Sequence, residues 1–141
     1  MRVINRNAPD AEILAVCQEW LALVAADRIG DALDLLASPA DGSVTWTPDS
    51  LRAYIGNYGS WEPWPDRSIY RVTAAETAVL PGDSPSRKPY ADVLRLTGNH
   101  HRGWVNLDLP LNGVWSDLTA EFEFAPVADG IAISLHDIHV L

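Results

Sequence analysis

The stretch Leu118-Thr119-Ala120-Glu121-Phe122-Glu123-Phe124 alternates strictly between apolar and polar side chains. Because successive side chains of a β-strand point to opposite faces of a sheet, its leucine, alanine and two phenylalanines share one face. This pattern is typical of an antiparallel strand that packs one face on a core and turns the other towards solvent. The stretch therefore predicts an antiparallel sheet covered by other elements on one face.

The residues that follow predict a hairpin and a distorted last strand. Asp129-Gly130 favours a tight turn, and apolar residues then alternate from Ile131 to Leu135. The apolar phase resumes one residue out of step at Ile138. Since one extra residue in a strand absorbs such a slip, we expect a β-bulge near His136-Asp137.

Three further strands are expected upstream, at residues 69–73, 93–96 and 104–109, which are rich in β-branched, aromatic and leucine side chains. Residues 81–89 are expected to form a loop, and residues 98–103 a turn that places His100 and His101 in solvent. The chain thus predicts about five strands.

The N-terminal third has helical periodicity instead. Apolar side chains recur every three or four residues over 10–26, after Asn7 as a possible cap and Pro9 in the first turn. A second helix is expected at residues 31–37. A third begins at Thr47-Pro48-Asp49-Ser50, which supplies a capping hydroxyl and a proline at the first position, and ends at Gly56.

Helices followed by antiparallel strands predict a single α+β domain over residues 1–141, with N-terminal helices packed on a curled antiparallel sheet. This order, with Trp20-Leu21 leading into Asp27-Arg28-Ile29-Gly30-Asp31-Ala32-Leu33, resembles the nuclear transport factor 2-like superfamily, which includes ketosteroid isomerases and polyketide cyclases. Residues 113–120 and 137–141 are also similar to the ends of small uncharacterised bacterial proteins. The resemblance implies a cone-shaped, cystatin-like layout with a pocket between helices and sheet, often dimeric through the outer sheet face, which serves catalysis in some members and binding in others.

Composition excludes several functional classes. Nineteen acidic residues against ten basic ones give the chain a net charge of −9, which opposes nucleic-acid binding. The charge indicates either solubility or attraction to a basic partner protein or a cationic ligand. No apolar run approaches the roughly 18 residues of a membrane span. Cys17 is the only cysteine, and residues 1–7 lack the apolar stretch of a signal peptide, so a cytoplasmic protein is expected.

The aromatic segment from residue 54 to residue 66 is the first candidate site. Tyr54, Tyr58, Trp61 and Trp64 lie there among glycines and prolines. Aromatic side chains with polar atoms are common at ligand and protein interfaces, so these four residues predict a ligand-binding mouth. The alternative is a loop that closes the core.

Asp92 is the second candidate, because a carboxylate is unusual inside a predicted strand and it shares its phase with Leu94 and Leu96. If that phase faces a pocket, burial raises the pKa of Asp92, which then acts as a general base beside Tyr54. Ketosteroid isomerases use a strand acid, a tyrosine and a second acid, a set that does not match this chain residue by residue.

No metal or cofactor is expected. His136 and His139 flank Asp137, but zinc requires three or four ligands and no third group is apparent, so a polar strand face is favoured. Cys17 lies on the apolar face of the first helix, as a core residue does. No nucleotide-binding, serine hydrolase or metalloprotease motif occurs.

Trp104 alternates with Asn106 and Asp108 on the polar face of its predicted strand, so we expect a homodimer through the sheet face near Trp104. The leading functional hypothesis is a non-catalytic binding module for a small apolar ligand or a partner protein. One alternative is a cofactor-free isomerase, dehydratase or cyclase that uses Asp92 and Tyr54. Another is an acidic immunity-type protein that blocks a basic toxin.

Overall fold

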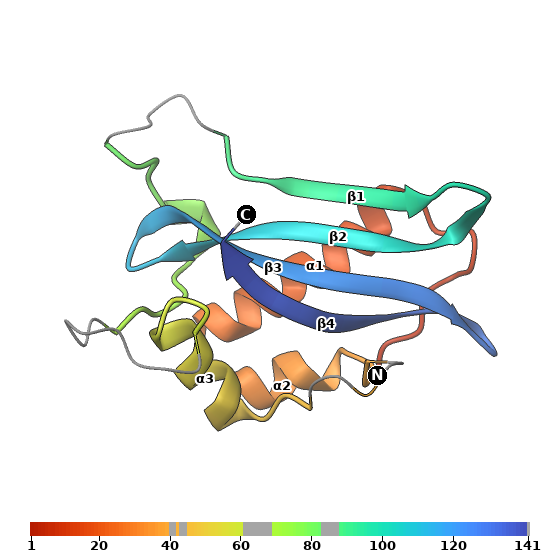
Figure 1. Cartoon of the computed structure of the whole chain (residues 1–141), viewed down its shortest axis with the longest axis horizontal. Coiled ribbons are helices and arrows are strands. Elements are labelled where there is room, and N and C mark those ends of the chain that lie inside the picture. Colours follow the sequence, from red (N-terminus) through yellow and green to blue (C-terminus); the bar gives the residue numbers. More distant parts are fainter. Residues whose placement is uncertain (40–41, 43–44, 61–68, 83–87, 141) are drawn as a thin grey trace.

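The computed structural model describes residues 1–39, 42, 45–60, 69–82 and 88–140. In these residues three helices precede a four-stranded antiparallel sheet of order β1-β2-β3-β4, which does not close into a barrel (Figure 1). The helices are α1 (Asp10–Ala25), α2 (Ile29–Asp34) and α3 (Pro48–Gly56), and η1 (Ala75–Thr77) is a short 3₁₀ helix. The strands are β1 (Ala91–Leu96), β2 (Asn99–Leu111), β3 (Val114–Val127) and β4 (Gly130–Val140). The α+β class is confirmed, but the described residues contain four strands rather than about five.

The fifth strand expected at residues 69–73 is reduced to one isolated bridge between Val72 and Leu111. Thr73 donates a backbone hydrogen bond to the Pro110 carbonyl at 3.0 Å. Proline has no N–H to return that bond, so the ladder stops there. The segment is therefore anchored to the end of β2 without becoming a strand.

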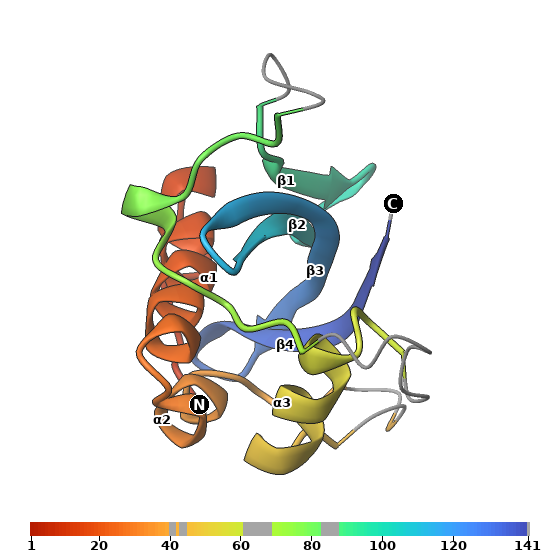
Figure 2. The same cartoon turned by 90° about the vertical axis from the view of Figure 1, so that its left-hand side faces the viewer.

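The core fills the space between the helices and the concave side of the curled sheet (Figure 2). Trp20 of α1 is fully buried and meets Phe122 of β3 edge to face, with ring centroids 5.1 Å apart. Phe124 and Ile133 are buried as their alternation predicts, whereas Leu33 of α2 is only half-buried. The apolar face identified in β3 is thus the face that meets the helices.

The bulge expected in the last strand is present. Glu121 pairs with Asp137 and Phe122 pairs with Leu135, so His136 is the extra residue of β4. This insertion keeps Leu135 and Ile138 on the buried face on either side of it.

The turn between β1 and β2 is shorter than predicted. Leu96 pairs with Asn99 across Thr97 and Gly98, so β2 begins at Asn99 and not at residue 104, where the predicted turn would place its start. His100 and His101 therefore lie in β2 and not in the turn. The register shifts after Arg95, and the additional β2 residues are absorbed at that irregularity.

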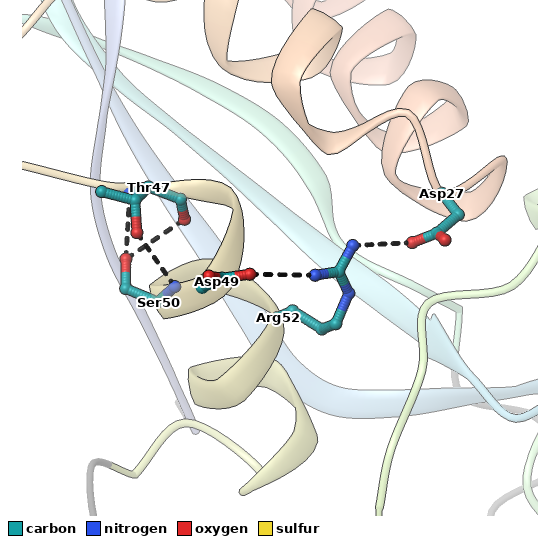
Figure 3. Close-up of polar contacts among 5 residues, drawn as sticks. All are labelled: Asp27, Thr47, Asp49, Ser50 and Arg52. Atoms are coloured by element: carbon teal, nitrogen blue, oxygen red, sulfur yellow. Dashed lines mark hydrogen bonds and ion pairs between the residues drawn. The ribbon is translucent and has the colours of Figure 1, made fainter.

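The start of α3 follows the sequence prediction. The Thr47 side chain accepts a hydrogen bond from the Ser50 backbone N–H at 3.1 Å, and the Ser50 hydroxyl accepts one from the Thr47 N–H at 2.9 Å, forming a capping box (Figure 3). Arg52 then bridges Asp49 of its own helix and Asp27 of the α1–α2 link. These ion pairs are exposed, so they orient α3 and add little stability.

The start of α1 differs in detail, because Pro9 and not Asn7 occupies the N-cap position. Asn7 instead donates its backbone N–H to the Asn5 side chain. None of the described helices is long and apolar enough to cross a membrane.

The two edges of the sheet are treated differently. The outer edge of β4 is covered by other segments. Ile4 pairs with Ile131, Ala37 donates to the Ile133 carbonyl at 2.8 Å, and Trp46 donates to the Leu135 carbonyl at 3.1 Å. No helix or strand lies beyond β1 in Figure 1, and no backbone hydrogen bond from a described residue reaches its outer edge.

Candidate functional site

A cavity of about 530 Å³ lies between α1, η1 and the beginning of β1. This volume is in the range of pockets that hold small organic molecules. The lining residues are mostly apolar: Gln18, Leu21, Ala22, Ala25, Ala26, Ala74, Ala75, Glu76, Pro89, Tyr90, Ala91, Leu107 and Trp115.

The α1 wall of the cavity is made of alanines. Ala22, Ala25 and Ala26 recur at the three- and four-residue spacing that places side chains on one helix face. Because each side chain is a single methyl group, the helix surface stays low there and space remains between α1 and the loop that carries η1. Sequence reasoning missed this site, since an alanine side chain has no functional group that would mark a binding residue.

The opposite wall is held by a buried carboxylate. Asp108 of β2 is 1% exposed, and its side chain accepts hydrogen bonds from the Tyr90 backbone N–H at 3.0 Å and the Thr119 hydroxyl at 2.7 Å. The Asp108 N–H in turn donates to the Tyr90 carbonyl at 3.0 Å. Asp108 therefore fixes the backbone of a cavity-lining residue.

Trp115 is placed by the β2–β3 hairpin. Its backbone N–H donates to the Val79 carbonyl at 2.9 Å, and the Val79 N–H donates to the Gly113 carbonyl at 3.0 Å. These bonds tie the segment after η1 to the hairpin, so the loop wall and the sheet wall of the cavity are joined.

Tyr54, a predicted ligand-binding residue, is 8% exposed and does not line this cavity. Its ring meets Trp46 edge to face at 5.4 Å, and its hydroxyl lies 3.5 Å from Asp137 of β4. Burial, followed by the charge of Asp137, raises the pKa of Tyr54. The tyrosine joins α3 to the last strand.

Tyr58 has a similar place beyond the end of α3. It packs on Tyr70 at 4.8 Å and donates its hydroxyl proton to Asp117 at the start of β3. Burial, with a further contribution from the Asp117 carboxylate, raises the pKa of Tyr58 to about 12. Trp61 and Trp64 lie outside the described residues, so a ligand-binding role for the aromatic segment stays a prediction.

The Tyr58 pKa predicts alkaline loss of stability. Because folding raises this pKa from about 10, the contribution of the protonated phenol is complete below pH 10 and disappears as the pH rises towards 12. We expect the difference in unfolding free energy between the parent and Tyr58→Phe to shrink over that range in urea titrations. Asp117→Asn, which keeps the phenol, should bring the Tyr58 absorbance transition to lower pH. A Tyr58 transition unmoved by Asp117→Asn would contradict the assigned contact.

Asp92 does not lie buried in a pocket, as the prediction of a general base requires. Its side chain is exposed on β1, together with Leu94 and Leu96 of the same phase. The carboxylate beside the Tyr54 hydroxyl is that of Asp137. The proposed catalytic pair is therefore not brought together.

The histidines of β4 make local contacts. His136, displaced by the bulge, meets Trp104 edge to face at 5.4 Å. His139 lies 3.3 Å from Asp137 and 3.7 Å from Glu121. Across the described ranges, no group of three histidine, cysteine, aspartate or glutamate side chains is arranged to hold a metal ion. Cys17 is buried in the core, and desolvation raises the pKa of its thiol well above the usual range.

Comparisons of the chain with protein-family models, with curated protein sequences and with solved structures found no match.

Proposed function

We propose that this protein binds a small apolar ligand in the cavity between α1, η1 and β1. The observation that carries the proposal is a preformed space of about 530 Å³ with a mostly apolar lining. Transfer of apolar ligand surface from water supplies the driving force for binding at such a site. The core elsewhere between helix and sheet is filled by side chains such as Trp20, Phe122 and Phe124.

The polar groups of the lining restrict the class of ligand. The lining residues whose side chains carry polar groups are Gln18, Glu76, Tyr90 and Trp115. Glu76 and the net charge of −9 oppose an anionic head group. The preferred ligand is therefore a neutral or cationic molecule with an apolar body and one hydrogen-bonding group.

Membership of the nuclear transport factor 2-like superfamily forms part of this proposal. It is supported by the order of elements and by the helices on the concave side of the sheet (Figure 2). Fold alone carries no activity, so the binding function rests on the cavity and not on the resemblance.

Filling the cavity is expected to abolish binding. Ala22 is exposed on its helix and lines the cavity, so the indole of Ala22→Trp should occupy the space that the ligand needs without disturbing the fold. N-phenyl-1-naphthylamine, a neutral apolar dye, should bind the parent with one site per chain and bind Ala22→Trp at least tenfold more weakly. Fluorescence titration measures the affinity, and thermal unfolding confirms that the variant is folded.

Ala15→Trp is the matched control, because Ala15 is exposed on the same helix but does not line the cavity. It should bind the dye as the parent does. Equal binding by Ala22→Trp and the parent would show that the dye occupies another place. A carboxylate derivative of the dye should bind more weakly than the neutral one if Glu76 is at the site.

A further inference from the structure

β1 is the edge strand of the sheet, and no described residue forms a backbone hydrogen bond with its outer edge. Asp108 donates to the Tyr90 carbonyl, so the Tyr90 backbone points towards β2. Directions alternate along an antiparallel ladder, and the N–H and C=O groups of Ala91, Val93 and Arg95 therefore point to the outer edge. Such an edge is a template for another strand.

The strand is held rigidly in place from its buried side. The Arg95 guanidinium donates to Asp10 at 2.8 Å and to the Ala8 carbonyl at 3.0 Å, and it lies 5.7 Å from the centre of the Phe124 ring. These contacts tie β1 to the start of α1 and to the core. The outer edge is thus preorganised, which lowers the entropic cost of pairing.

Beyond Asp92, the outward face of β1 carries two exposed leucines, where edge strands usually carry charge. Leu94 is 53% exposed and Leu96 is 42% exposed. Leu94 pairs with the half-buried Trp104 of β2, so the two side chains form a continuous apolar row that ends at the sheet edge.

Charge permits a second copy at this place in spite of the net charge of −9. Arg95 pairs with Asp10 and Arg102 pairs with Glu123, which neutralises four of the charges beside β1. Lys88 and Asp92 on and before the strand oppose each other in sign. Positive and negative charges near the β1 edge therefore nearly cancel, whereas the chain as a whole is strongly negative.

We propose that two copies of this chain pair antiparallel through β1, with Leu94 on the two-fold axis, to form one continuous eight-stranded sheet. In this register Leu94 faces the partner's Leu94, and Val93 exchanges backbone hydrogen bonds with the partner's Arg95. The apolar row then runs from Trp104 through both leucines to the partner's Trp104. Registers centred on Asp92 or Arg95 instead place like charges opposite each other.

Cysteine cross-linking tests the register. Leu94 forms a non-hydrogen-bonded pair in the proposed dimer, with Cα atoms about 4.5 Å apart, which suits a disulfide. Leu94→Cys should form a disulfide-linked dimer on mild oxidation. Asp92→Cys should not, because the two cysteines would be about 13 Å apart along the strands. Buried Cys17 leaves the parent without a competing exposed thiol.

Proline substitution tests the edge itself. The Val93 N–H points away from β2, so Val93→Pro removes a dimer hydrogen bond and leaves the fold of the monomer intact. Sedimentation velocity from micromolar to millimolar concentration should give dimers for the parent and monomers for Val93→Pro, with equal far-ultraviolet circular dichroism.

Three results would overturn the proposal. A parent that is monomeric at every concentration excludes the dimer. A Val93→Pro variant that dimerises as the parent does excludes the β1 edge. Cross-linking of Trp104→Cys without cross-linking of Leu94→Cys would instead establish a dimer through the sheet face.

Discussion

Replacing Trp20 by alanine is expected to lower the free energy of unfolding by about 3–5 kcal/mol. The indole is fully buried between α1 and the sheet and packs edge to face on Phe122. Its removal loses apolar burial and leaves a cavity that the flanking helix and strand cannot close fully. Urea denaturation followed by circular dichroism measures the change.

Two further variants sharpen this experiment. Gln18→Ala changes an exposed position of the same helix and should alter stability by less than about 0.5 kcal/mol. Trp20→Phe should cost less than Trp20→Ala, because it keeps a ring and removes an indole N–H that has no hydrogen-bond acceptor among the described residues. If Trp20→Ala unfolds at the same urea concentration as the parent, the helix packs on the sheet through another face.

Gly103→Ala is expected to destabilise the protein by about 3 kcal/mol, the upper part of the range for overpacking. A Cβ atom at Gly103 would lie 2.1 Å from the Leu94 carbonyl oxygen and 2.7 Å from the Phe124 ring. Backbone atoms cannot move aside as a side-chain end can, so β1 would have to separate from β2. Hydrogen exchange should show the amides of β1 losing protection before those of β3.

Gly30→Ala is the matched control. A Cβ atom at Gly30 of α2 would have no neighbour within 4 Å. Alanine has the higher helix propensity, so this change should stabilise the protein by up to about 1 kcal/mol. Equal effects of the two substitutions would show that β1 does not approach Gly103 as closely as described.

Gly103 also shows where the prediction from the sequence is wrong. Turn propensity predicts that this glycine belongs to a turn, yet it lies within β2 and is required by the close approach of the Leu94 carbonyl. Turn propensity is a local property, whereas that approach depends on the pairing of two strands. A single sequence contains the first and not the second.

The candidate site predicted from the sequence also differs from the cavity found in the structure. The aromatic pattern predicts Tyr54 and Tyr58 as ligand-binding residues. The structure places their hydroxyl groups in contact with Asp137 and Asp117, respectively. The cavity instead depends on Ala22 and its neighbours, residues without a functional signature. The cavity arises from the way in which several elements pack together, so no local residue pattern predicts it.

The sequence by itself determined the features that follow from neighbouring residues. The alternation in β3, the one-residue slip that places the bulge at His136, and the capping box at Thr47 all arise from strand and helix periodicity or from backbone hydrogen bonds within a few positions. Only the tertiary structure decided the rest. That Asp92 faces solvent, that Asp137 meets Tyr54, and that β1 is the edge strand of the sheet depend on strand register and helix placement, because these set contacts between residues far apart in the chain.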